Sequence, residues 1–164
     1  MGRDKALLPF RGAPLGETAA RAVESTAGNV TIVGRAEFGH FRSILDRYPG
    51  EGPLGGILTA LADSNADWNL IVACDMPELT PGFLARLLDA AEKCGAFAFV
   101  PRGEPLCAVY HRDCREPFEA AFGRGVRKIM EAVVEVPAVI CPIEEVAYFQ
   151  NVNTPEDWSG YAAE

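Results

Sequence analysis

The residue with the strongest claim to chemistry is Asp75, which directly follows an apolar run at residues 70–74. In an open α/β sheet, ligands bind beyond the carboxyl ends of the strands, so this carboxylate stands where a site is expected. Mg²⁺ usually binds through one or two carboxylates together with substrate phosphates. The position is therefore compatible with a metal-binding role for Asp75. An aspartate that only caps the loop after the strand is the alternative.

A glycine-rich segment at residues 50–56 reads Gly-Glu-Gly-Pro-Leu-Gly-Gly and lies at the start of a predicted helix. Glycine lets the backbone approach a ligand closely, and the free amide groups of a helix N-terminus bind anions. No Gly-Lys-Ser or Gly-Lys-Thr ends the segment, so it is not a Walker motif. A tight turn with close helix packing is the competing interpretation. Asp46, just upstream, places a second carboxylate at the same rim.

The basic residues Arg124, Arg127 and Lys128 form a cluster on an acidic protein, which makes them a candidate anion site. Arg124 and Lys128 are four residues apart, so they would share one face of a helix if the segment were helical. Lys5 belongs to a charged segment that, taken alone, indicates a solvated terminus.

Two amides, Asn151 and Asn153, flank a valine ahead of a predicted helix start at Thr154. Amides ligate metals and bind substrates, but they are also common turn formers. Both interpretations remain open for this pair.

The elements that must position these residues alternate between short apolar runs and longer amphipathic ones. Strands are predicted at residues 30–33, 68–74, 96–100, 106–110 and 138–141, and helices at residues 17–27, 53–64, 80–94, 113–122 and 126–134. The run at 68–74 is too continuously apolar for a sheet with one wet face. The pattern predicts a single domain over residues 1–164, with a mostly parallel sheet layered between helices in an α/β fold.

Composition limits the classes of function. The 164 residues carry a formal net charge of −8, which argues against nucleic-acid binding through a broad basic face. No apolar run approaches the roughly 20 residues of a membrane span. The five cysteines form no Cys-x-x-Cys pair, a pattern typical of reduced thiols in a cytoplasmic protein.

Five segments, in order and over nearly the whole chain, resemble the molybdenum cofactor guanylyltransferase family, part of the nucleotidyltransferases with a Rossmann-like fold. They are Met-Gly-Arg-Asp-Lys-Ala-Leu-Leu at residues 1–8, the glycine-rich segment at 46–57, Ala-Cys-Asp-Met-Pro at 73–77, Glu-Pro-Leu-Cys-Ala-Val-Tyr at 104–110 and Asn-Val-Asn-Thr-Pro-Glu-Asp at 151–157. Each segment is weak alone, but five in this order form a specific signal.

The resemblance implies transfer of GMP from GTP to the terminal phosphate of molybdopterin or its molybdenum-bearing form, with release of pyrophosphate. By the same resemblance, Asp75 would hold Mg²⁺ and Lys5 would pair with phosphate oxygens as the two catalytic residues. Gly52 would contact the nucleotide, and Asp46 would either contact the nucleotide or help to hold the metal. Other proteins of molybdenum cofactor synthesis are the further partners that it implies.

On the acceptor side, the resemblance places Asn151 and Asn153 near the pterin. Its phosphate would be gripped by Arg124, Arg127 and Lys128.

Other interpretations stay open at this stage. A cytidylyltransferase, or a sugar-phosphate or alcohol-phosphate nucleotidyltransferase, would share the fold, and so would a non-catalytic nucleotide-binding remnant. A signalling receiver domain also has an aspartate before Met-Pro, but it needs a spacer there, and here Asp75 abuts Met76.

The chain departs from the family at its start. In the family, an apolar strand and a Leu-Ala-Gly-Gly-x-Ser-x-Arg segment precede the Met-Gly-x-Asp-Lys piece, whereas this sequence begins at Met1. We expect an N-terminally truncated sequence, with a gap in the sheet beside the strand at 30–33 and half of the nucleotide pocket missing. An in-frame stop codon directly upstream of Met1 would contradict this expectation.

Overall fold

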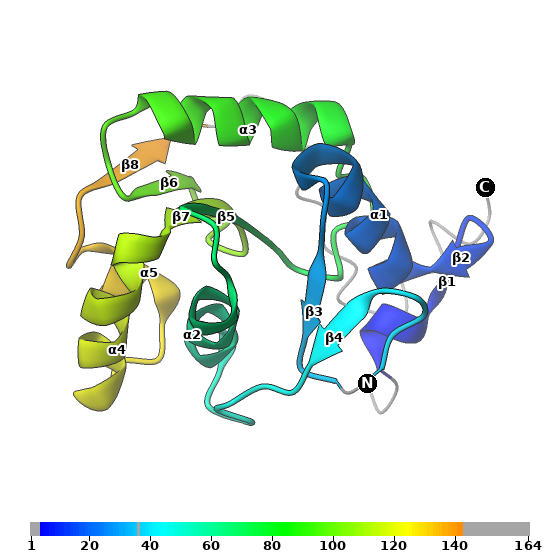
Figure 1. The fold of residues 1–164 in the computed structure, drawn as a ribbon, viewed down its shortest axis with the longest axis horizontal. Coiled ribbons are helices and arrows are strands. Elements are labelled where there is room, and N and C mark those ends of the chain that lie inside the picture. Colours follow the sequence, from blue (N-terminus) through cyan, green and yellow to red (C-terminus); the bar gives the residue numbers. More distant parts are fainter. Residues whose placement is uncertain (1–3, 36, 143–164) are drawn as a thin grey trace.

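The structure is a computed structural model that describes residues 4–35 and 37–142. It is an α/β fold in layers (Figure 1). The strands are β1 (Pro9–Phe10), β2 (Ala13–Pro14), β3 (Thr31–Val33), β4 (Arg42–Ile44), β5 (Trp68–Val72), β6 (Ala98–Pro101), β7 (Cys107–His111) and β8 (Ala138–Cys141). The helices are α1 (Leu15–Ala27), α2 (Pro53–Asp63), α3 (Pro81–Lys93), α4 (Arg115–Gly123) and α5 (Ile129–Val133), with 3₁₀ turns η1 (Lys5–Leu7) and η2 (Arg112–Cys114).

The described strands form a main sheet and two smaller ones. The main sheet has the order β5-β7-β6-β8, in which β7 runs antiparallel to both neighbours and β6 runs parallel to β8. A second sheet pairs β3 with β4 in parallel, and β1 and β2 form a short hairpin. The predicted α/β class is confirmed. The main sheet is mixed because a tight turn after β6 returns the chain directly as β7.

The core fills both faces of the main sheet. In the central strand β7, Cys107 and Val109 pack with α1 and α3, whereas Ala108 and Tyr110 pack with α2, α4 and α5. All four side chains are 0% exposed. A strand buried on both faces must be continuously apolar, which is what the sequence showed here.

Local signals explain where several helices begin and end. The Thr80 hydroxyl accepts a hydrogen bond from the amide of Phe83 at 3.3 Å, and Pro81 occupies the first turn of α3. Gly28 ends α1 in the left-handed conformation, with φ of 76°. These positions agree with the helix limits expected from the sequence.

The segment after α4 differs from the prediction. The sequence predicted one helix over residues 126–134, but α4 ends at Gly123 and α5 begins only at Ile129. Gly125, with φ of 93°, lies in the connecting loop and is incompatible with a continuous helix. The idea that Arg124 and Lys128 share a helix face is therefore wrong.

The main sheet and the β3–β4 sheet are separated by a pocket of about 1020 Å³, which we call the slot. Residues of β3 and β5 both line it. Among the described strands, β3 pairs only with β4 and β5 only with β7, so the edges that face the slot form no ladder. Within the described part of the chain, no helix is long and apolar enough to cross a membrane.

Candidate active site

Lys5 and Asp75 meet at the carboxyl end of β5. The Lys5 Nζ lies 3.5 Å from Oδ2 of Asp75, and the two side chains are 33% and 21% exposed. This exposure leaves the pair accessible to a ligand from solvent. Asp75 stands directly beyond the end of the strand, as the sequence predicted, and its carboxylate faces a cation.

The segment that carries Lys5 is anchored rather than free. Asp4 caps η1, since its carboxylate accepts a hydrogen bond from the amide of Ala6 at 3.1 Å, and it also pairs with Arg35 at 2.7 Å. Ala6 is buried against α1, where a Cβ added to Gly16 would lie only 3.0 Å from the Ala6 Cβ. The segment is therefore held in place at Asp4 and Ala6, while the Lys5 side chain remains partly exposed.

A third charged residue, Glu104, lies close to Asp75. It belongs to the turn between β6 and β7, and the pairing of Val72 with Cys107 brings that turn to the end of β5. Burial, and then the negative charge of Asp75, raise the pKa of Glu104. The sequence alone indicated no role for Glu104, although this residue lies in one of the family-like segments.

Asp46 serves the loop that leads into α2. Its Oδ1 accepts hydrogen bonds from the Thr59 hydroxyl at 2.8 Å and from the amide of Tyr48 at 3.0 Å. Thr59 is fully buried and its oxygen accepts a bond from the amide of Arg47 at 3.0 Å. These contacts fix the chain just ahead of the glycine turn, residues 50–52.

The glycine turn ends at Gly52, which precedes α2 with φ of 86° and no side-chain cap. This left-handed backbone requires glycine. The first turn of α2 has no capping side chain and no acidic residue, which favours a nearby anion. It offers fewer free amides than most helix starts, because Pro53 has no N–H and the amide of Gly55 donates to the carbonyl of Gly52 at 3.1 Å.

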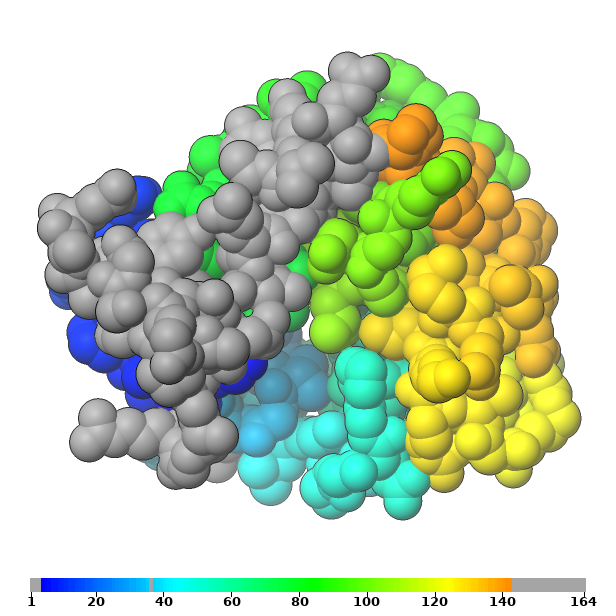
Figure 2. Space-filling model, turned by 180° about the vertical axis from the view of Figure 1, so that it is seen from behind, coloured from blue at the N-terminus to red at the C-terminus, as the bar shows by residue number. Residues whose placement is uncertain are grey.

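Arg127 is joined to the glycine turn. It donates to Glu51 at 2.7 Å and to the carbonyl of Phe122 at 2.9 Å, and its guanidinium lies 3.9 Å from the centre of the Phe122 ring. In the view from behind, residues 124–135 (yellow) lie directly beside the region of the glycine turn (cyan) (Figure 2). Arg127 and Gly52 are therefore brought together, as part of one corner of the molecule.

The other predicted anion ligands are placed differently. Arg124 pairs with Glu135, and Lys128 lies 3.3 Å from Glu131 and is 81% exposed. The three basic residues therefore point to three different carboxylates. Asn151 and Asn153 lie outside the described residues.

Asp75 offers oxygen ligands of the kind that a hard cation prefers. Within residues 4–35 and 37–142, no group of three or more His, Cys, Asp and Glu side chains could hold a metal ion. This arrangement fits a Mg²⁺ ion that binds through one or two carboxylates and otherwise through substrate phosphates. It does not fit a closed structural metal site.

A carboxylate and a lysine at the end of a strand, with an uncapped helix start in the same fold, suit the handling of a nucleoside triphosphate. The class of protein that this fold and site define is a nucleotidyltransferase. Comparison with known families makes the assignment specific: residues 1–136 match the family model of the MobA-like NTP transferase domain, and the chain belongs to this family.

Two relatives show how far the similarity extends. The chain is 34% identical over 165 residues to a molybdenum cofactor guanylyltransferase of Xanthomonas euvesicatoria pv. vesicatoria (strain 85-10). The aligned region covers 97% of this chain and 86% of the relative. It is 32% identical over 179 residues to a probable molybdenum cofactor guanylyltransferase of Methanothermobacter thermautotrophicus. Here the aligned region covers 96% of this chain and 90% of the relative.

Solved structures agree with the fold. Molybdopterin-guanine dinucleotide biosynthesis protein A from Archaeoglobus fulgidus superposes with a TM-score of 0.82 at 28% identity, covering 98% of this chain and 89% of that one. The 2-C-methyl-D-erythritol 4-phosphate cytidylyltransferase of Thermus thermophilus superposes with a TM-score of 0.77 over 97% of this chain and 92% of that one. At 18% identity, the second likeness concerns the fold alone.

Proposed function

We propose that this protein transfers GMP from GTP to the terminal phosphate of molybdopterin or its molybdenum-bearing form. The products are a dinucleotide cofactor and pyrophosphate. The observation that carries the proposal is the Lys5–Asp75 pair at the end of β5, in a chain that belongs to the MobA-like family. The relatives named as guanylyltransferases favour GTP over CTP as the nucleotide.

The reaction makes and breaks one bond to phosphorus. An oxygen of the acceptor phosphate attacks the α-phosphorus of GTP, and the bond from that phosphorus to the bridging α–β oxygen breaks, so that its electron pair leaves with pyrophosphate. Both reactants are polyanions, so the main task of the site is to align them and offset their charge. No covalent enzyme intermediate is needed. The thiols of Cys107 and Cys114 are unsuited to one, because burial raises the pKa of each to about 12.

Lys5 and Asp75 would act on opposite charges. Lys5 would donate to phosphate oxygens once it leaves its contact with Asp75, and Asp75 would hold Mg²⁺. A bound divalent ion supplies positive charge at the phosphate oxygens. Glu104 adds a second carboxylate near Asp75, which strengthens the local negative field.

The remaining site residues belong to the nucleotide and acceptor sides. Gly52 would let the backbone at the start of α2 approach the nucleotide, and Asp46 would hold the loop before it. Arg127, Arg124 and Lys128 would grip the acceptor phosphate after exchanging their present carboxylate partners, and Asn151 and Asn153 would contact the pterin. We further propose a cytoplasmic location, which fits the free cysteines, with other proteins of cofactor synthesis as partners.

The test measures pyrophosphate release and dinucleotide formation with molybdopterin, Mg²⁺ and either GTP or CTP. We expect turnover that depends on molybdopterin and is roughly 100-fold faster with GTP, since a site that hydrogen-bonds one base rejects the other strongly. Equal rates with both nucleotides would refute the guanine assignment. Tight GTP binding by calorimetry without turnover of either nucleotide would refute the catalytic assignment and leave a nucleotide-binding module.

A further inference from the structure

Lys5 is carried by a short turn that is weak on its own. η1 spans three residues, and its backbone hydrogen bonds run from the amide of Leu7 to the carbonyl of Asp4 and from the amide of Leu8 to the carbonyl of Lys5, both at 3.1 Å. Short 3₁₀ segments have poor hydrogen-bond geometry, and a single turn fixes many dihedral angles for few bonds. Contacts from outside the turn must therefore hold it if Lys5 is to stand in one place.

Asp4 uses its two carboxylate oxygens for two tasks. Oδ1 accepts a hydrogen bond from the amide of Ala6 at 3.1 Å and so caps η1. Oδ2 accepts a hydrogen bond from Nη2 of Arg35 at 2.7 Å. Arg35 lies two residues beyond the end of β3, so this ion pair ties the turn to the β3–β4 sheet.

Both partners of this ion pair rest on the same part of the core. The guanidinium of Arg35 lies 4.8 Å from the centre of the Phe38 ring. Phe38 and Ala6 belong to one buried cluster beside α1. A Cβ added to Gly16 of α1 would lie 2.9 Å from the Phe38 ring and 3.0 Å from the Ala6 Cβ, so both residues pack closely on that helix. The core therefore fixes Arg35 and η1 relative to one another.

Arg35 also lies at the candidate active site. Burial, and then the charges of Asp75 and Asp4, raise the pKa of Cys74, whereas Arg35 lowers it. These three charged groups thus act on one thiol just beyond the end of β5. The contacts of Arg35 with Asp4 and with the Phe38 ring indicate that it supports the turn rather than receives a ligand.

We propose that Arg35 is a positioning residue for the transfer reaction: through its ion pair with Asp4 it fixes η1, and so sets where Lys5 meets the triphosphate. This inference rests on the proposed function, in which Lys5 donates to phosphate oxygens. Groups that act on a reaction must be held near one geometry, and a misplacement of about 1 Å can lower the rate roughly 100-fold. The lysine side chain is long and flexible, so the backbone that carries it must be fixed.

The first test reads the brace in the free protein by amide hydrogen exchange at residues 6–8. Arg35→Gln removes the positive charge and should speed this exchange roughly fivefold, the upper range for a partly exposed ion pair. Asp4→Asn keeps a good capping group and removes only the ion pair, so it should give the same change. The double variant should exchange no faster than either single variant. Unchanged exchange, or effects that add in the double variant, would overturn the proposal.

The second test asks whether Arg35 acts through Lys5. Calorimetry with Mg²⁺ and GTP measures affinity without a need for turnover. Arg35→Gln should weaken GTP binding roughly three- to fivefold, and Arg35→Lys, which keeps the charge, should restore most of the affinity. In a Lys5→Ala background, Arg35→Gln should have no further effect, because the group that it positions is gone. A further loss of the same size in that background would overturn the positioning role.

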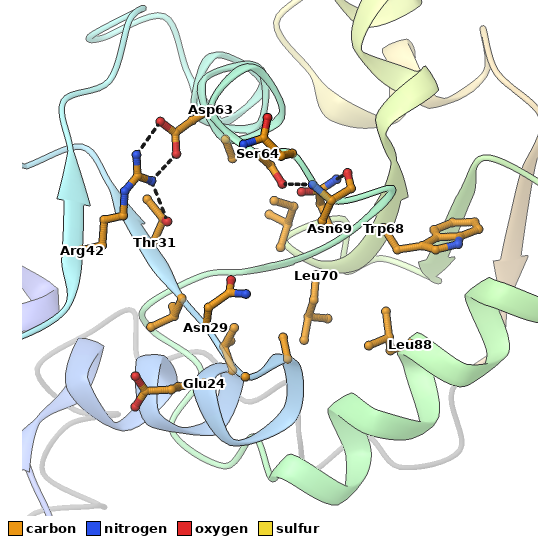
Figure 3. A pocket seen from close by; sticks show the side chains of 18 of the residues that line it. Glu24, Asn29, Thr31, Arg42, Asp63, Ser64, Trp68, Asn69, Leu70 and Leu88 are labelled. Atoms are coloured by element: carbon orange, nitrogen blue, oxygen red, sulfur yellow. Dashed lines mark hydrogen bonds and ion pairs between the residues drawn. The ribbon is translucent and has the colours of Figure 1, made fainter.

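The matched control is Arg42→Gln. Arg42 of β4 pairs with Asp63 of α2 and donates to the hydroxyl of Thr31, the first residue of β3, at 3.0 Å (Figure 3). An arginine–aspartate pair therefore lies near each end of β3, and the pair with Asp4 is the one that contacts η1. Arg42→Gln should leave amide exchange in η1 and GTP affinity unchanged. Equal effects of Arg42→Gln and Arg35→Gln would overturn the proposal and assign both pairs to general stability.

Failure of this inference and failure of the proposed function give different results. Unchanged exchange in η1 and unchanged GTP affinity in Arg35→Gln, with normal turnover, would refute the positioning role alone. Absence of GTP binding by the wild type would refute the proposed function and this inference with it. Faster exchange together with a loss of affinity that disappears in the Lys5→Ala background supports both.

Discussion

Replacing Asp75 by asparagine separates a catalytic carboxylate from a structural one. The change is nearly isosteric and removes only the negative charge. For charges 3.5 Å apart, the Coulomb energy is about 5 kcal/mol at an effective dielectric constant of 20. Lys5 and Asp75 are 33% and 21% exposed, so solvent screens this to about 1 kcal/mol of stability at most. Lys5 can be hydrated when the partner charge is lost.

The effect on catalysis should be much larger. A preorganised charge that acts on the reacting phosphates contributes about 10² to 10³ in kcat, or about 3 to 4 kcal/mol of transition-state stabilisation. We therefore expect Asp75→Asn to lower kcat at least 100-fold, by order of magnitude, while urea unfolding changes by no more than about 1 kcal/mol. Steady-state pyrophosphate release at saturating GTP and a urea titration measure the two quantities.

The matched control is Glu17→Gln on α1. The Glu17 side chain is 22% exposed, close to the exposure of Asp75, and it pairs with a single cation, Arg21. Loss of this pair should also change stability by at most about 1 kcal/mol, but it should leave kcat unchanged. Unaltered kcat in Asp75→Asn, or an equal loss in both variants, would refute the metal-binding role of Asp75.

Three further predictions concern the anchor, the helix start and the turn near Asp75. Lys5→Ala should weaken GTP binding roughly 10-fold or more in calorimetry, since a charged hydrogen bond contributes about 1.5 to 3 kcal/mol, and unchanged affinity would return Lys5 to a solvated role. Gly55→Ala should destabilise the protein by about 1 to 3 kcal/mol in urea unfolding, because its Cβ would lie 2.8 Å from the Cβ of Tyr48. Gly56→Ala, whose Cβ meets nothing within 4 Å, should stabilise α2, and the same sign for both variants would contradict the packing argument. Burial and the charge of Asp75 raise the pKa of Glu104 above its ordinary 4.5, so the folded protein loses stability as pH rises through the folded pKa. The stability of Glu104→Gln relative to wild type should therefore increase above about pH 4.5. A stability difference that does not depend on pH would disprove the shift.

The part of the fold that the sequence predicted is the part carried by local signals. α1 and α3 begin and end near the expected residues because capping residues and glycines act within one turn. Asp75 was found because an apolar strand and the polar residue at its end are adjacent in sequence. Such features need no knowledge of which strands pair.

The part that was missed depends on long-range pairing. β4, Arg-Ser-Ile, is too short and polar to be recognised as a strand, and it exists because it pairs with β3. Glu104 reaches the site only through the register of β5 and β7, a relation between residues more than thirty positions apart. Arg127 likewise meets Glu51 across 76 positions. The turn between β6 and β7, with a glutamate just before a buried strand, was the one local signal for Glu104.

The slot lies between β3 and β5, the two strands that position Lys5 and Asp75. Lys5 comes from a segment anchored at the end of β3, whereas Asp75 follows β5, so the distance between the two side chains depends on how the two strands are held relative to one another. Strands at a sheet edge open at lower free energy than central strands. The Lys5–Asp75 geometry therefore depends on how firmly β3 and β5 are held in place.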